Sequence, residues 1–271
     1  MCRTRRLKPF LDSLVAHYER PAFIARDPIA VCHRFDDPRD QEVIGLYAAT
    51  LAWGQRRTIL NKLDELCDRM EQRPYSFVWD FGRSRDVTRL DGFRHRTFTS
   101  VDAVWFTACL SRLLHQYKTV EAIFAAGHAL GALDTGPAIH DFSERMMNAL
   151  AGTPPRMQKH LARPLRGSAA KRLCLYLRWM VRPGPVDLGL WTSIGPHQLV
   201  LPLDVHSGRQ ARALGVLTRN SNDWQAAQEL TLACRDLCQE DPARYDYAFF
   251  GLGISGELPL HLTPPPAANR A

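Results

Sequence analysis

Residues 164–182 of the chain read PLRGSAAKRLCLYLRWMVR, which predicts a turn that leads into a helix. The proline, glycine and serine at the start are typical of a turn. The helix is expected over about 169–181, and the run RPGP at 182–185 ends it. Lys171 falls in the first helical turn, where the positive end of the helix dipole and any burial both disfavour a charged ammonium. The stretch therefore predicts a helix that carries a usable amine at its start.

Helical periodicity extends from this stretch over the rest of the chain. Apolar residues recur at three- and four-residue steps, and no segment shows the two-residue alternation of a half-buried strand. Before the stretch, the pattern predicts helices over 7–18, 40–53, 58–73, 102–114, 120–130 and 139–150. It further predicts helices over 205–214, 224–238 and 245–250, with irregular connections over 83–98, 152–167 and 183–203. The predicted fold class is all-α.

The composition is that of a folded chain without a metal or cofactor signature. Hydrophobic residues make up 45% and charged residues 23% of the 271 residues, which suffices for a core without a staple. The seven cysteines are scattered and contain no C-x-x-C pair, which argues against a zinc site or an iron–sulfur cluster. No uncharged run reaches membrane-spanning length, and no apolar segment follows the charged N-terminus. We therefore expect a soluble, cytoplasmic protein with no metal and no cofactor.

Arginine supplies most of the positive charge. The net charge is +7, and only five of the 35 basic residues are lysines. A modest positive excess suits a polyanionic partner. Arginine cannot replace lysine where a free amine must attack carbon, which draws attention to a lysine placed at a helix start.

Residues 199–215 read LVLPLDVHSGRQARALG and form the second informative stretch. An apolar run leads to Asp204 at the start of a short helix. An aspartate in this place is an excellent N-cap, so by itself it needs no catalytic purpose. Lys171 taken alone is an ordinary surface lysine, and His206 and Arg209 are surface residues unless a site exists here.

Taken together, the two stretches resemble the helix-hairpin-helix superfamily of base-excision DNA glycosylases. In that superfamily a glycine-rich hairpin leads into the helix with the nucleophilic lysine, and a later apolar run with proline and aspartate opens another helix. Here the hairpin is LRGS at 165–168, followed by Lys171, and the later segment is VLPLDVH at 200–206. The helix over 43–53, with Gln55 after it, resembles the early helix that ends near a glutamine at the DNA cleft.

Two features depart from the superfamily pattern. The hairpin has one glycine and a serine in place of the usual Pro-Gly-x-Gly. The spacing of 33 residues between Lys171 and Asp204 is longer than in most members and nearer to the archaeal 8-oxoguanine glycosylases. The chain as a whole also resembles an uncharacterised bacterial family marked by KRLxxxLRWMVR, here residues 171–182, which implies no activity.

The glycosylase resemblance implies a bifunctional DNA glycosylase and AP lyase. A damaged nucleotide is flipped into a cleft, where Lys171 attacks C1′ of the sugar and forms a Schiff base. Asp204 orients the amine and stabilises the positive charge that develops on the sugar. The implied partner is double-stranded DNA with a damaged base or an abasic site, bound by a monomeric protein.

The resemblance also implies residues that contact DNA without reading its sequence. Unpaired N–H groups at the turn are expected to hold one phosphate, and basic side chains the flanking ones. The expected DNA-binding residues are Arg166, Gly167, Ser168, Arg172, His206 and Arg209. The base pocket is expected to draw on Trp53, Gln55 and Trp179.

Two helical subdomains that flank a cleft are implied as well. The first, 40–185, carries the helix-hairpin-helix element with Lys171, and the second, 1–39 plus 186–262, carries Asp204. Residues 263–271 are expected to form a disordered tail, because their prolines and alanines offer nothing to bury.

Two other functions stay open at this point. The chain could be a non-catalytic nucleic-acid-binding protein on the same fold, or a helical interaction protein with no nucleic-acid role. The enzyme hypothesis makes a geometric prediction that the others do not. The Lys171 amine and the Asp204 carboxylate should face one cleft within about 5–6 Å of each other.

Overall fold

Helices account for most of residues 3–25, 27–82, 84–129 and 131–255, which are the residues that this computed structural model describes. The α-helices in chain order are α1 (Arg3–Arg6), α2 (Lys8–Tyr18), α3 (Pro21–Ile24), α4 (Pro38–Thr50), α5 (Arg56–Arg69), α6 (Pro74–Trp79), α7 (Ser84–Arg89), α8 (Ser100–Tyr117), α9 (Val120–Ala126), α10 (Gly136–Asn148), α11 (Lys171–Val181), α12 (Val205–Ala213), α13 (Trp224–Arg235) and α14 (Asp246–Ser255). The 3₁₀ turns are η1 (Pro28–Arg34), η2 (Pro155–Lys159), η3 (Pro164–Arg166), η4 (Pro196–Gln198) and η5 (Pro242–Tyr245). Extended pairing within the described ranges is limited to isolated bridges such as Ser168–Asp223. The all-α prediction is confirmed.

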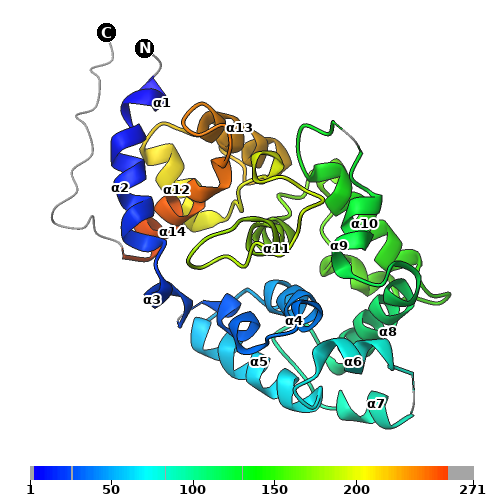
Figure 1. Ribbon diagram of the computed structural model, residues 1–271. Coiled ribbons are helices and arrows are strands. Elements are labelled where there is room, and N and C mark those ends of the chain that lie inside the picture. Colours follow the sequence, from blue (N-terminus) through cyan, green and yellow to red (C-terminus); the bar gives the residue numbers. More distant parts are fainter. Residues whose placement is uncertain (1–2, 26, 83, 130, 256–271) are drawn as a thin grey trace.

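The helix α11 lies in the middle of the molecule, between helices from both halves of the chain (Figure 1). It packs against α4, and all of its side chains from Leu173 onward are buried. The helix starts at Lys171, about two residues later than predicted, because Ala170 adopts a left-handed conformation with φ of 50°. This turn of the backbone leaves Lys171 as the first helical residue.

The two ends of the chain pack against each other. In Figure 1 the N-terminal helix α2 lies along α14, and α14 in turn packs against α12. The face that α2 buries carries apolar residues at steps of one, three and four, namely Phe10, Leu11, Leu14 and Val15. The turn η1, by contrast, packs against α4 and α5. The boundaries of the two subdomains remain a prediction.

The residues before α11 form tight turns. The 3₁₀ turn η3 leads to Gly167, whose φ of 90° is a left-handed conformation that glycine adopts without strain. The preceding α-helix, α10, ends at Asn148, and the stretch between it and α11 contains the turns η2 and η3. The helix-hairpin-helix element expected at this place is therefore not confirmed.

Short helices occupy part of the segments expected to be irregular. Residues 83–98 begin with α7, and α6 follows directly on the predicted helix over 58–73. The predicted helix over 120–130 is shorter, since α9 ends at Ala126 and Gly127 follows as its C-cap. Boundaries of this kind depend on single capping residues, which periodicity does not resolve.

None of the described helices is both long and apolar enough to cross a membrane. The predicted disordered tail, 263–271, lies outside the described residues.

Candidate active site

The described residues enclose a cavity of about 740 Å³ at which several helices begin. Its wall includes the starts of α5, α11, α12 and α14, and the start of η1. The positive ends of these helices favour negatively charged groups nearby. Three aspartates that stand at helix starts line the cavity, namely Asp27, Asp204 and Asp246.

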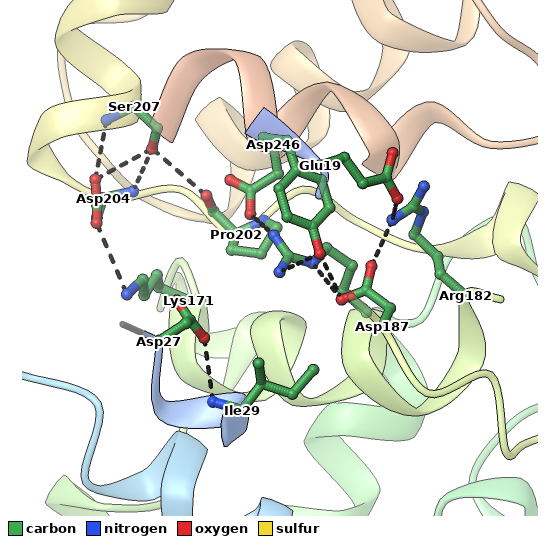
Figure 2. A network of polar contacts seen from close by, with 12 residues as sticks. Glu19, Asp27, Ile29, Lys171, Arg182, Asp187, Pro202, Asp204, Ser207 and Asp246 are labelled. Carbon is green, nitrogen blue, oxygen red and sulfur yellow. Dashed lines mark hydrogen bonds and ion pairs between the residues drawn. The ribbon is translucent and has the colours of Figure 1, made fainter. Parts of the chain in front are cut away.

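Lys171 and Asp204 face each other across this cavity. The Lys171 Nζ and Asp204 Oδ2 atoms are 3.7 Å apart, and the two side chains are 26% and 25% exposed. Figure 2 shows the two side chains pointing toward one another, one from the first residue of α11 and the other from the start of α12. The prediction that the amine and the carboxylate share one cleft within about 5–6 Å is confirmed.

Asp204 is also the N-cap of α12, as expected of an aspartate in this place. Its Oδ1 atom accepts hydrogen bonds from the backbone N–H groups of His206 at 2.8 Å and Ser207 at 2.9 Å. The Ser207 hydroxyl in turn accepts from the Asp204 N–H at 3.0 Å, which completes a capping box. The cap uses Oδ1 and the ion pair uses Oδ2. The structural and the chemical interpretation of Asp204 are therefore compatible.

The backbone of the turn before α11 differs from the expectation. The Gly167 N–H donates to the Pro164 carbonyl at 2.8 Å, and the Ser168 N–H donates to the Arg163 carbonyl at 3.3 Å. Both N–H groups, which we expected to be unpaired, are thus bonded within the turn. The side chain of Ser168 accepts from the Ala170 N–H at 3.2 Å. All of Arg166, Gly167 and Ser168 are exposed.

Arg172 has a structural role in this arrangement, and its expected contact with phosphate stays a prediction. Its guanidinium donates to the carbonyls of Thr50 at 2.8 Å and Lys159 at 3.0 Å. It also lies over the Trp53 ring, 4.9 Å from the centroid. Burial lowers the pKa of Arg172 to about 10. The side chain therefore ties α11 to the end of α4 and to η2.

The other expected DNA contacts lie at the surface. His206 and Arg209 are exposed on α12, and His206 lines the cavity. Arg209 and Arg166 are not part of the cavity wall. The structure thus groups Lys171, Asp204 and His206 at one cavity, with the two arginines on the outer surface of neighbouring segments.

The three residues expected in the base pocket lie in different surroundings. Trp53 lines the cavity, where its ring packs near His160 and His95. Gln55 is exposed as the N-cap residue of α5 and is not part of the cavity wall. The prediction for Trp179 is wrong, because its side chain has no exposed surface and lies in the core.

Residues 27–255 match the model of a protein family described as "Protein of unknown function (DUF2400)". The chain belongs to this family. The matched range runs from η1 to the end of α14 and contains both members of the cavity pair. No curated protein and no solved structure matches the chain significantly. The prediction of an uncharacterised family is confirmed, and membership leaves the activity open.

Two buried aspartates of the cavity wall were not predicted from the sequence of this family member. Asp27 is 5% exposed and Asp246 is 4% exposed. Burial raises the pKa of Asp246 to about 6, against the opposing effect of the Arg178 guanidinium, and burial likewise raises the pKa of Asp27. The sequence around these two aspartates does not indicate a site, because an aspartate at a helix start is usually a cap. Only tertiary packing brings the two residues to Lys171, since η1 packs against α4 and α5, and α14 packs against α12.

An ion network lies behind the cavity and involves the end of the KRLxxxLRWMVR stretch, residues 178–182. Arg178, itself part of the cavity wall, pairs with Asp246 and with Asp187, whose Oδ1 is 3.3 Å from the Arg178 Nε. Arg182 pairs with Asp187 and, at 2.8 Å, with Asp241 (Figure 2 shows the Asp187 pair). The signature residues thus hold the wall of the cavity in place.

Proposed function

We propose that this protein is a DNA base-excision glycosylase with an associated AP-lyase activity. The observation that carries the proposal is the 3.7 Å between the Lys171 Nζ and the Asp204 Oδ2 at one cavity. An amine beside a carboxylate in a partly enclosed cavity is the arrangement that a Schiff-base nucleophile requires. The resemblance of the two stretches to helix-hairpin-helix glycosylases supports the same assignment.

In the proposed reaction the free amine of Lys171 attacks C1′ of a flipped nucleotide. The new C1′–N bond replaces the bond to the base, which leaves with the proton that the amine gives up. Opening of the sugar ring then gives an imine between Lys171 and C1′. Loss of a proton from C2′ of this imine expels the 3′ phosphate, which is the lyase step. Asp204 stabilises the positive charge that develops on the sugar.

The size of the cavity supports a single nucleotide as the substrate. Its volume of about 740 Å³ falls within the range of about 300–1,000 Å³ that is typical of small-ligand pockets. A duplex does not fit such a space, so the proposed substrate is one nucleotide flipped out of double-stranded DNA. The proposed location of the protein is the cytoplasm.

The proposed DNA contacts outside the cavity come from exposed residues. Arg166 lies on the turn before α11, and Arg209 lies on α12. Both can reach phosphates without reading the base sequence. His206, exposed at the cavity wall, is placed for a contact to the sugar–phosphate of the flipped nucleotide.

Borohydride trapping tests the proposal. Reduction of the imine should give a covalent complex between the wild-type protein and a duplex that contains an abasic site. We expect Lys171→Ala to abolish the complex and Lys62→Ala to leave it unchanged. Lys62 is a matched control, because it is a helical, ion-paired lysine with 29% exposure against 26% for Lys171.

The Asp204→Asn variant tests the catalytic role of Asp204 separately from its role as the N-cap of α12. Asparagine retains an oxygen for the N-cap bonds, so stability should stay close to that of the wild type. The trapping rate should fall by about 100-fold, the scale of a lost electrostatic contact in a catalytic site. Trapping that survives in Lys171→Ala would show that Lys171 is not the nucleophile.

The alternatives correspond to other outcomes. Salt-dependent duplex binding without trapping on a broad panel of lesions would favour a non-catalytic nucleic-acid-binding protein. Absence of both activities would favour a helical interaction protein.

A further inference from the structure

The deeper part of the cavity contains groups that the proposed attack at C1′ does not use. Asp27 and Asp246 line the cavity and are about 5% exposed or less, whereas Lys171 is 26% exposed. Phe23 and Phe250 line the same space with their ring centroids 6.0 Å apart in an edge-to-face arrangement. The cavity wall therefore combines two buried carboxylates with two half-buried aromatic side chains.

Each of the two carboxylates has only one oxygen engaged among the described residues. The Oδ1 of Asp27 accepts from the Ile29 N–H at 3.2 Å. The Oδ2 of Asp246 accepts from the Arg178 guanidinium. Within the described ranges no hydrogen bond reaches the second oxygen of either residue, and neither oxygen is a fully enclosed, unpaired atom. The second oxygens are therefore acceptors in contact with the cavity.

Three cations lie near these oxygens, and none donates a hydrogen bond to the second oxygen of either aspartate within the described residues. Arg56 lies over the Phe250 ring, 5.6 Å from its centroid. The Arg178 N–H groups donate to Asp246, to Asp187 and to the Tyr247 hydroxyl at 3.2 Å. The Lys171 amine pairs with Asp204. A ligand that fills the cavity removes these two oxygens from solvent. A ligand that brings N–H donors to them is then favoured over one that brings carbonyls, which would leave the acceptors unpaired.

We infer that Asp27, Asp246, Phe23 and Phe250 form the base subsite, and that the subsite selects damaged bases that carry an exocyclic amino group. This inference rests on the proposed function. An ionised carboxylate only accepts hydrogen bonds, and an amino group offers two N–H donors. A uracil-type base would place carbonyl oxygens against the carboxylates. The aromatic side chains supply apolar surface for the flat faces of the base.

Matched lesion pairs test the inference. The pairs are 5-hydroxycytosine with 5-hydroxyuracil, and 8-oxoguanine with 8-oxohypoxanthine, each differing in one amino group. Duplexes with each base are titrated by fluorescence anisotropy at pH 8 against Lys171→Gln, which cannot form the imine. We expect the amino member of each pair to bind at least tenfold more tightly, since a site built for a hydrogen bond discriminates strongly.

Asp27→Asn and Asp246→Asn, each combined with Lys171→Gln, should shrink the preference to below threefold or reverse it. Asparagine replaces a free acceptor with an amide that can turn its N–H donors toward the base, which favours carbonyls. A merely structural role would weaken both members of a pair equally. Asp64→Asn is the control, because Asp64 lies on the surface in a pair with Arg34. If Asp246→Asn unfolds on loss of the Arg178 pair, Asp27→Asn decides alone.

Equal affinity for both members of each pair, or a preference that both asparagine variants retain, would overturn the inference. Trapping of abasic DNA by the wild-type protein involves no base and reports on the proposed function alone. The two proposals can therefore fail separately.

Discussion

At the level of single residues, the Asp204 carboxylate shows why one side chain can serve a helix and a reaction together. Its two oxygens point to different partners, two backbone N–H groups on one side and the Lys171 amine on the other. A cap holds the carboxylate rigidly, because the bonds to α12 restrict its rotation. The amine is thereby oriented by a group that is itself fixed in place.

His160, which packs against Trp53 of the cavity wall, provides a pH-dependent contribution to stability. Its Nε2 lies 3.5 Å from the Asp102 Oδ1. Burial lowers the pKa of His160 to about 4, against the opposing effect of the Asp102 carboxylate. An unfolded imidazole takes up its proton near pH 6.5. Between these values only the unfolded chain binds the proton, so acidification from about pH 6.5 to 4 favours unfolding.

We therefore expect the thermal midpoint of His160→Gln to fall less than that of the wild type between pH 6.5 and 4. Circular dichroism melts of both proteins over this range measure the difference. The variant has to be compared with the wild type, because other groups also change the stability with pH. Burial raises the pKa of Glu42 to about 7 and that of Asp246 to about 6, so acidification through these values stabilises the folded state. Parallel pH profiles would contradict the assignment.

At the level of elements, α11 organises the molecule through both of its ends. Its first residue belongs to the cavity pair, and its second ties it to α4 through Thr50. Its last turn carries Arg178, and Arg182 follows as the C-cap. The signature KRLxxxLRWMVR therefore combines a site residue with three arginines that fix the position of the helix.

Removal of Arg182 should destabilise the protein strongly. The side chain is 3% exposed and pairs with Asp187, Asp241 and Glu19. Arg182→Met removes the cation that Glu19 and Asp241 share and leaves Asp187 with Arg178 alone, which costs about 3–5 kcal/mol of unfolding free energy. Urea denaturation measures this cost. Arg34→Met is the control, since Arg34 is 47% exposed in its pair with Asp64 and should cost at most about 1 kcal/mol. Similar losses in the two variants would contradict the role of the buried network.

At the level of the whole molecule, the net charge of +7 and the exposed arginines near the cavity predict salt-dependent DNA binding. Arg166→Gln and Arg209→Gln should each reduce the slope of log K against log salt concentration by about one. They should weaken binding to damaged and undamaged duplexes alike, because phosphate contacts read no base. Anisotropy titrations at several salt concentrations measure the slopes. Lys118→Gln, at the C-terminal end of α8, is the control and should leave the slope unchanged. Slopes that are equal in all variants would exclude phosphate contacts by Arg166 and Arg209.

The helical class and the order of the main helices follow from the sequence alone. Periodicity in stretches such as 7–18 and 40–53 reports which face of a helix is apolar, and α2 and α4 occupy these stretches. Short elements such as α6 and α7, and the left-handed Ala170 that delays α11, depend on single residues and on packing, so the pattern does not resolve them.

The sequence by itself placed Lys171 and Asp204 at helix starts, because the start of a helix has a recognisable local signature. That the two residues form a pair was predicted from the resemblance of their stretches to helix-hairpin-helix glycosylases. Tertiary structure decided the rest of the cavity. Asp27 and Asp246 are 219 positions apart and line one cavity with Lys171 because η1 packs against α4, α4 against α11, and α14 against α12. Trp179 falls in the core because α11 is buried from Leu173 onward, and periodicity within the helix does not tell which of its side chains reach the cavity.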